Sequence, residues 1–230
     1  MLKLICLGDS ITAKEKDPSG TLKLTPRLKQ VLPNWTIINA GVSGDNTKGA
    51  LNRLQTDVLD RCPDLVTVLF GTADASENKG ITIEEYEANL RSMVEQITPL
   101  KTLIITSPPI VEAFLTARRK AFPQANFVSM KTLEDYVNVA AKVALSTNSH
   151  FLDLWSKMQL QSNYSRFFKT KDGVHLNGQG YEFLVQILSK KIQSIEIYRT
   201  ALIFVYSIRY QLIFDNRNFK SFSTTSNIKI

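Results

Sequence analysis

The chain has 230 residues, of which 43% are hydrophobic and 21% are charged, a composition typical of a soluble globular protein. A chain of this length is long enough to form one domain with an appendage, and its core needs no metal or disulfide for stability. The formal net charge is +7. Because basic residues mostly alternate with acidic ones along the body, this charge indicates a solvated surface and predicts no nucleic-acid partner.

The cysteines, the N-terminus and the hydropathy pattern exclude several other classes. Two isolated cysteines, Cys6 and Cys62, do not form the framework of a disulfide-rich secreted domain, and no CxxC or HExxH spacing indicates a zinc site. The apolar run at the N-terminus leads directly into polar residues, which leaves no room for a signal peptide, and no stretch is long enough to span a membrane. We therefore expect a cytoplasmic protein without stable membrane insertion. The oligomeric state is left open, a homo-oligomer included.

The first 195 residues alternate short apolar runs with longer amphipathic segments. Runs typical of strands buried on both faces occupy Leu2–Leu7, Trp35–Asn39, Leu65–Phe70, Thr102–Thr106 and Phe151–Leu154. Helical spacing of apolar residues begins with Leu22, Leu28, Val31 and Leu32, and continues over Asn46–Asp60, Ile83–Ile97, Leu133–Leu145 and Gly178–Ile192. Strands that alternate with helices form a parallel sheet covered on both faces, so the sequence predicts an α/β fold.

Two segments depart from this alternation. Residues 107–126 contain three prolines and the basic cluster Arg118–Lys120, which predicts a long connection with a short helix after the fourth strand. Such a connection either shapes a substrate pocket at the carboxyl edge of the sheet or crosses the surface as a solvated loop. Residues 196–230 lack the repeating pattern and are interpreted as a C-terminal extension of unknown role, following a domain over residues 1–195. An added edge strand is one of the forms open to this extension.

Four polar blocks lie where the predicted strands end or where the last helix begins. They are Gly8–Thr12, Asn39–Asn46, Gly71–Asp74 and Asp172–His175. Ligands of parallel α/β sheets bind at the carboxyl ends of the strands. The sequence therefore places the candidate functional residues together at one edge of the sheet.

The residue types in these blocks suit nucleophilic catalysis. A serine hydroxyl needs a neighbouring base, and of the two histidines only His175 has a carboxylate, Asp172, three residues before it. That carboxylate would accept the Nδ1 proton and leave Nε2 facing Ser10. The alternatives are that Ser10 only serves a strand-to-helix turn and that His175 only marks a helix entry. His150, at the start of a strand, is interpreted as a structural or surface residue.

Together the four blocks resemble those of the GDSL, or SGNH, hydrolase family over about residues 1–195. The resemblance implies a three-layer α/β/α, flavodoxin-like fold with a central five-stranded parallel sheet. It also implies ester hydrolysis by Ser10 with Asp172 and His175, with no metal and no cofactor. By the same resemblance, the oxyanion hole would be formed by the backbone N–H groups of Ser10 and Gly44 and by a side-chain amide from the third block.

The third block departs from the family pattern. The family has Gly-x-Asn-Asp, whereas this chain has Ala73 at the asparagine position and so lacks the donor. Loss of one oxyanion donor typically costs about 10²–10³-fold in turnover, so we expect a weakened enzyme and not an inactive one. The sequence does not tell whether Ala73 is natural or engineered. Asn46 and Asn78 are candidates to replace the missing amide.

The function predicted from these observations is a serine esterase that acts on small carboxylic esters, with short acyl chains favoured and a small-molecule ester as its partner. Lysophospholipase, thioesterase and carbohydrate acetylesterase activities use the same residues and are left open. A binding protein that keeps the fold without catalysis is a further alternative, which the intact Ser10, Asp172 and His175 disfavour. A nucleotide or flavin binder is disfavoured because the chain lacks GxGxxG and P-loop motifs.

Overall fold

The computed structural model describes residues 1–78 and 81–222, with side chains described up to residue 201. Its centre is a five-stranded parallel sheet in the order β2-β1-β3-β4-β5. The strands are β1 (Leu2–Gly8), β2 (Trp35–Gly41), β3 (Leu65–Leu69), β4 (Thr102–Ile105) and β5 (His150–Leu152). This is the flavodoxin-like strand order, in which the order reverses between β1 and β3. The predicted fold class and all five strands are thus confirmed, with bounds that differ by one or two residues.

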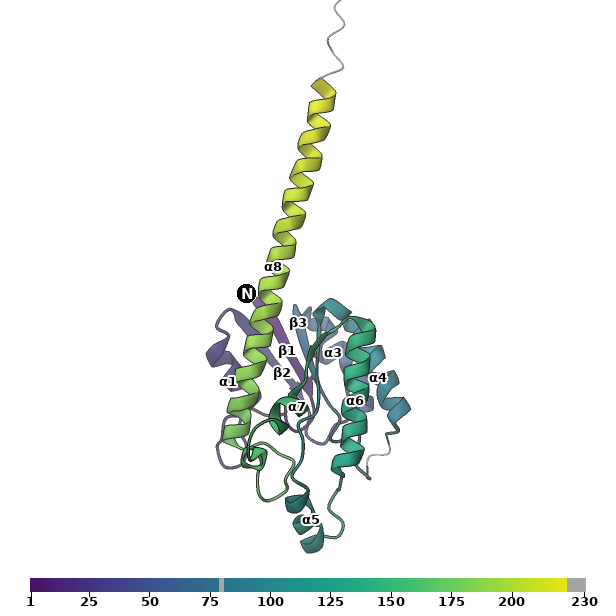
Figure 1. Ribbon diagram of the computed structural model, residues 1–230, viewed down its shortest axis with the longest axis vertical. Coiled ribbons are helices and arrows are strands. Elements are labelled where there is room, and N and C mark those ends of the chain that lie inside the picture. The colour runs from purple at the N-terminus through teal and green to yellow at the C-terminus, as the bar shows by residue number, and fades with distance from the viewer. Residues whose placement is uncertain (79–80, 223–230) are drawn as a thin grey trace, which may run out of the picture. The chain divides into compact units, whose positions relative to one another are not determined.

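The helices cover both faces of the sheet. They are α1 (Leu24–Val31), α2 (Thr47–Asn52), α3 (Leu54–Asp57), α4 (Ile83–Ile97), α5 (Glu112–Ala121), α6 (Met130–Thr147), α7 (Leu154–Gln159) and α8 (Gly178–Phe222). Short 3-10 turns follow at Leu59–Arg61, Pro99–Lys101 and Tyr164–Phe167. Figure 1 shows α1 and the first part of α8 on one side of the sheet, and α4 and α6 on the other.

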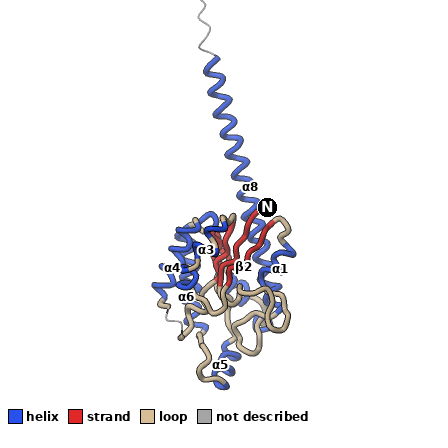
Figure 2. The backbone as a smooth tube through the Cα atoms, turned by 180° about the vertical axis from the view of Figure 1, so that it is seen from behind, coloured by secondary structure: helices blue, strands red, loops and turns tan. Residues whose placement is uncertain are grey.

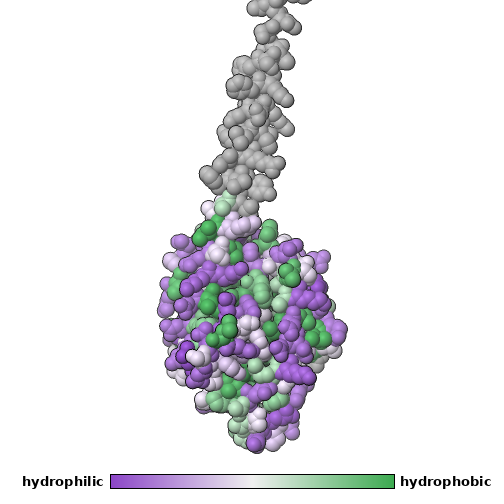
Figure 3. Space-filling view, viewed as in Figure 1, coloured by the Kyte–Doolittle hydropathy of each residue, from purple (hydrophilic) through white to green (hydrophobic). Residues whose placement is uncertain are grey.

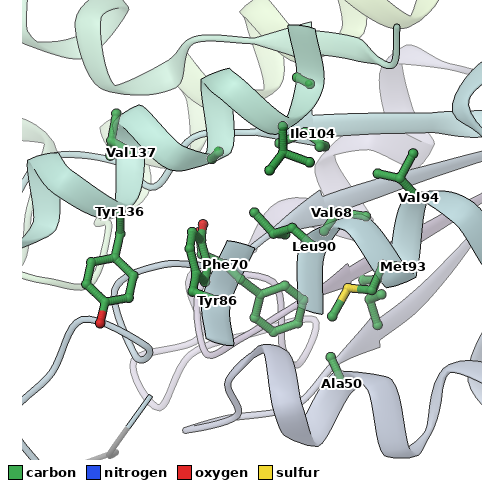
Figure 4. Packing of buried hydrophobic residues seen from close by; sticks show 14 of the residues in the cluster. Ala50, Val68, Phe70, Tyr86, Leu90, Met93, Val94, Ile104, Tyr136 and Val137 are labelled. Atoms are coloured by element: carbon green, nitrogen blue, oxygen red, sulfur yellow. The ribbon is translucent and has the colours of Figure 1, made fainter. Parts of the chain in front are cut away.

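The core forms where alternate strand residues meet the helices on each face. On one face, Ile5, Leu7, Val66, Val68 and Ile104 contribute to a single cluster with residues of α2, α3, α4 and α6. Figure 4 shows Leu90, Met93 and Val94 of α4 directed at Val68 and Ile104 of the sheet. The apolar residues of α4 recur at helical spacing, and Thr82 caps its first turn by accepting a hydrogen bond from the N–H of Glu85. The predicted bounds of this helix are confirmed.

The helix predicted over Asn46–Asp60 is wrong as a single element. It is divided into α2, α3 and a 3-10 turn, and Arg53 at the first break has a non-helical backbone with φ −115°. The Arg53 side chain donates to the carboxylates of Asp45 and Asp57 and to the carbonyl oxygen of Ala40. Apolar periodicity did not reveal this break, because the contacts of Arg53 form only when β2 lies beside the helix.

The last helix extends beyond the segment Gly178–Ile192 predicted for it. The backbone is helical through Phe222, so the edge strand considered for the C-terminal extension does not form there. The chain divides into two compact units, Met1–Leu188 and a second that begins at Ser189. The predicted domain boundary at residue 195 stays a prediction, and side chains beyond residue 201 lie outside the described residues.

The surface in view mixes hydrophilic residues with scattered hydrophobic ones (Figure 3). The exposed large apolar side chains, such as Leu100, Leu145 and Leu160, come from different elements. Within the residues that the structure describes, no helix combines the length and apolarity required to cross a membrane.

Loops gather beyond the carboxyl ends of the strands, with α5 among them (Figure 2). The four polar blocks singled out in the sequence belong to this edge, since three of them follow β1, β2 and β3 directly. The fold therefore brings together loops that are up to 165 residues apart in the chain.

Candidate active site

Ser10 lies in the tight turn that follows β1. The Asp9 carboxylate accepts a hydrogen bond from the N–H of Ile11 at 2.8 Å, and the N–H of Ala13 donates to the carbonyl oxygen of Asp9 at 2.9 Å. These bonds fix the turn, and Asp9 itself is only 3% exposed. The Ser10 side chain is partly exposed at the sheet edge. Asp9 therefore serves the turn, while the Ser10 side chain lies at the edge where the loops gather.

The second loop of the site, Lys169–His175, is closed by backbone hydrogen bonds. The N–H of Lys169 donates to the carbonyl oxygen of His175 at 2.8 Å, and the N–H of Gly173 donates to Lys169 at 2.9 Å. Gly173 has φ +67°, and a Cβ atom at this position would lie 2.5 Å from the carbonyl oxygen of Val111. Glycine is therefore required here by both the backbone conformation and the close approach of the neighbouring loop.

The structure brings Ser10, His175 and Asp172 into one hydrogen-bonded chain. His175 Nε2 lies 2.9 Å from Ser10 Oγ, and His175 Nδ1 lies 3.0 Å from Asp172 Oδ2. The other carboxylate oxygen of Asp172 accepts hydrogen bonds from the N–H groups of Val174 and His175 at 2.9 and 2.8 Å. The Asp172 carboxylate thus fixes both the backbone of this turn and the His175 ring.

These contacts set the charge of Asp172. Burial by itself would raise its pKa, but the hydrogen bonds from the His175 ring and from the backbone N–H groups of His175 and Val174 outweigh burial. The result is a pKa lowered to about 2. The carboxylate is therefore ionised at neutral pH and suited to accept the Nδ1 proton, an arrangement that directs Nε2 toward the serine as an acceptor.

Beside this chain of three lies a cavity of about 390 Å³ with a largely apolar lining. Ser10, Gly44, Ala73 and His175 all line it. Gly44 has φ +79°, a conformation that favours glycine. Gly44 and Ala73, the other two residues of the expected oxyanion hole, thus border the same space as Ser10, whereas Asp172 does not line this cavity.

The residues that form this geometry belong to a segment that matches a known protein family. The model of the GDSL-like lipase/acylhydrolase family matches residues 6–183, which include all four polar blocks. The chain belongs to this family. It is an ester-bond hydrolase, and its esterase or acylhydrolase activity is that of the GDSL family.

Relatives named as esterases match most of this GDSL hydrolase. The isoamyl acetate-hydrolyzing esterase 1 homolog of Homo sapiens is 31% identical over 217 residues, covering 85% of this chain and 84% of the relative. The acetylxylan esterase of Geobacillus stearothermophilus is 27% identical over 220 residues, covering 83% and 93%. The crystal structure of the lipase/acylhydrolase from Enterococcus faecalis superposes with a TM-score of 0.74 at 30% identity, covering 84% of this chain and 96% of that one.

The third block of this GDSL hydrolase is fixed by Asp74. Its carboxylate accepts hydrogen bonds from the N–H and hydroxyl of Thr47 at 2.8 and 2.6 Å and from the N–H of Gly71 at 3.1 Å. Burial raises the pKa of Asp74, which is 1% exposed. Asp74 joins the loops after β2 and β3, so it has a structural role and presents no group to the cavity.

Neither asparagine considered as a replacement for the missing amide lines the cavity. Asn46 caps α2 by accepting a hydrogen bond from the N–H of Gly49, and Asn78 is exposed. Asn126 lines the cavity instead and donates from Nδ2 to the hydroxyl of Ser76 at 2.9 Å. Sequence reasoning missed Asn126 as a donor, although it closes the proline-rich segment that was expected to shape the pocket.

That segment does shape the pocket. Leu115 and Arg118 of α5 line the cavity together with Asn126, which excludes the alternative of a purely solvated crossover. Leu115 is 2% exposed and supplies apolar surface, while Arg118 brings a positive charge to the lining. His150 begins β5 and lines neither this cavity nor its neighbour, in agreement with its structural interpretation.

A buried lysine supports the loop of Ser10 from the inside. Lys23 is 7% exposed, and its Nζ donates to the carbonyl oxygens of Ser10, at 2.6 Å, and of Ala13. Burial lowers the pKa of Lys23 to about 8 and raises that of Asp9 to about 7. No sequence signal could have identified Lys23, because its burial depends on the packing of the loop around it.

Proposed function

We propose that this GDSL hydrolase cleaves small carboxylic esters through a Ser-His-Asp mechanism, with Ser10 as nucleophile, His175 as general base and acid, and Asp172 as the group that orients the ring. The observation that carries the proposal is the hydrogen-bonded chain Ser10–His175–Asp172, with distances of 2.9 and 3.0 Å. A serine hydroxyl becomes a nucleophile when a positioned base removes its proton, and this geometry meets that requirement.

In the proposed reaction, Ser10 Oγ attacks the ester carbonyl while His175 Nε2 takes the hydroxyl proton. The bond to the alcohol oxygen then breaks, and His175 gives the proton to the departing alcohol. Water repeats the sequence on the acyl-enzyme and releases the acid. The N–H groups of Ser10 and Gly44 stabilise the oxyanion, while the missing amide at Ala73 makes turnover slower than that of a complete site.

Short acyl chains are the proposed preference, and acetate is the first candidate. The cavity of about 390 Å³ beside Ser10 is bounded by Leu115 and other apolar side chains and can receive the acyl group. Two relatives with different alcohol parts, an isoamyl acetate-hydrolyzing esterase homolog and an acetylxylan esterase, carry names that refer to acetyl esters.

The test is the hydrolysis of aryl esters from acetate to octanoate by the native protein and by Ser10→Ala. The matched control is Ser162→Ala, which changes an exposed serine outside both cavities of the site. We expect hydrolysis that is fastest for acetate, unchanged in the control and lost in Ser10→Ala. Equal rates in Ser10→Ala would overturn the nucleophile assignment, and faster cleavage of octanoate would overturn the short-chain preference.

A further inference from the structure

A second cavity, of about 690 Å³, opens on the other side of Ser10. Ser10, Ser43 and His175 line both cavities, so the two spaces meet at the candidate nucleophile. The second lining is strongly cationic: it includes Lys14, Lys16, Lys23, Lys169 and Lys171 against the two carboxylates of Asp17 and Asp172. Arg118 is the single lysine or arginine in the lining of the first cavity, so the difference in charge points to a different part of the substrate.

Both carboxylates in this lining already accept hydrogen bonds from other groups of the protein. Asp17 accepts hydrogen bonds from Lys169 Nζ at 2.5 Å, from the N–H and hydroxyl of Ser19, and from the N–H of Thr21. These bonds hold the pKa of Asp17 well below its ordinary value. Asp172 is bound to the His175 ring, as described above.

Three of the five lysines are not used by the fold. Lys169 pairs with Asp17, and Lys23 donates to backbone carbonyl oxygens. Lys14, Lys16 and Lys171 are exposed, and within the described part of the chain none of them forms an ion pair with an acidic side chain. Three ammonium groups around one cavity, of which Lys16 also interacts with the neighbouring Glu15 carboxylate, create a local positive potential that attracts an anion.

The cavity lies on the side where the alcohol part of the ester must leave. In the proposed reaction, the carbonyl oxygen faces Gly44 and Ala73, which line only the first cavity. The departing oxygen must receive its proton from His175 Nε2, and the second cavity is the one that extends from His175 past Asp172. Because Ser10 and His175 line both cavities while Gly44 and Ala73 line only the first, this arrangement favours an acyl group on the side of the first cavity and an alcohol part on the lysine side.

We propose that the second cavity binds an anionic group, a phosphate or a carboxylate, carried by the alcohol part of the ester. Lys14, Lys16 and Lys171 provide the charges, and Ser19, Thr21 and Thr170 add polar side chains to the same lining. Because the acyl and alcohol sides are defined only if Ser10 is the nucleophile, the inference rests on the proposed function.

The experiment compares three phenyl acetates that differ in the para substituent: a carboxylate, a phosphate monoester and a methyl ester as the neutral reference. Each kcat/KM is divided by the rate at which imidazole, a neutral nucleophile, cleaves the same acetyl ester, which corrects for the leaving group without charge repulsion. We expect either anion to exceed the neutral ester by about tenfold at low ionic strength, with the advantage decreasing as salt is added.

Two triple variants locate the effect. Replacement of Lys14, Lys16 and Lys171 by Gln should bring the ratio of anionic to neutral ester close to one. Replacement of Lys101, Lys131 and Lys157, which lie outside both cavities, removes the same net charge and should leave the ratio as it is in the native protein.

The failures of the two proposals are distinguishable. If all three esters are cleaved in a Ser10-dependent manner but with no advantage for an anion, the anionic subsite is wrong and the serine mechanism stands. The subsite is equally overturned if both triple variants change the ratio alike, since the effect then belongs to the net charge. Hydrolysis that persists in Ser10→Ala overturns the serine mechanism itself.

Discussion

Two aspartates at the carboxyl edge of the sheet perform similar backbone roles with different consequences. Asp172 and Asp74 each accept hydrogen bonds from two backbone N–H groups of the loops they fix. Asp172 has an oxygen left for the His175 ring and a pKa lowered to about 2. Asp74 uses its second oxygen on Gly71, and burial raises its pKa. In the proposed mechanism, Asp172 takes part because one of its oxygens is left for the His175 ring, whereas both oxygens of Asp74 are used to fix the loops.

The two loops also differ in how complete they are. The loop of Asp172 carries the histidine that completes the serine-histidine-aspartate arrangement, whereas the loop of Asp74 carries Ala73 where the family pattern has an asparagine. In the proposed mechanism, the first loop determines whether Ser10 is activated, and the second determines how well the oxyanion is stabilised. Variants of each loop therefore separate the two contributions.

The largest effect is expected from Asp172→Asn. Asparagine keeps an oxygen for the N–H groups of Val174 and His175, but its amide would face the ring and favour the wrong tautomer. We expect kcat/KM for an aryl acetate to decrease by about 10⁴-fold. The control is Asp135→Asn, an exposed position on α6. Near-native activity of Asp172→Asn with retained structure would show that the ring is oriented by another group.

The second effect concerns the incomplete loop. Ala73→Asn restores the amide donor of the family pattern, and we expect kcat to increase by about 10²–10³-fold with little change in KM, because the donor acts in the transition state. Ala73→Leu is the control, since it fills a similar volume without a donor. An unchanged kcat in Ala73→Asn would contradict the placement of position 73 at the oxyanion.

The smallest effect is the pH dependence of the free energy of unfolding. The lowered pKa of Asp172 means that its contribution is present above its ordinary pKa of 3.8 and is lost as pH falls toward about 2. The stability advantage of the native protein over Asp172→Asn should thus shrink by about 1–2 kcal/mol across that range, measured by urea unfolding.

The variant Asp74→Asn should show the opposite dependence of the free energy of unfolding on pH. Because burial raises the pKa of Asp74, ionisation costs stability, and the native protein should become less stable relative to this variant as pH rises above 3.8. The same direction of change in both variants would contradict the assignment of opposite pKa shifts to the two aspartates.

The sequence by itself determined the fold class, the five strands and the edge at which the polar blocks lie. Buried parallel strands have to be continuously apolar, and residues that follow parallel strands have to meet at one edge, so a linear pattern is sufficient for both. It also singled out Ser10, Asp172 and His175 as candidate partners, because Asp172 lies three residues before His175 and the polar blocks together resemble those of one family.

Tertiary structure decided what depends on contacts between distant segments. The break of the helix at Arg53 depends on Asp45 and Ala40, the position of Asn126 depends on how the segment after α5 folds over the cavity, and the burial of Lys23 depends on the loop that follows β1. The presence of an apolar cavity and a lysine-lined cavity beside Ser10 also depends on contacts between distant segments. The charges of the lysine-lined cavity come from two loops more than 150 residues apart, and their potential exists only once the fold places them around one cavity.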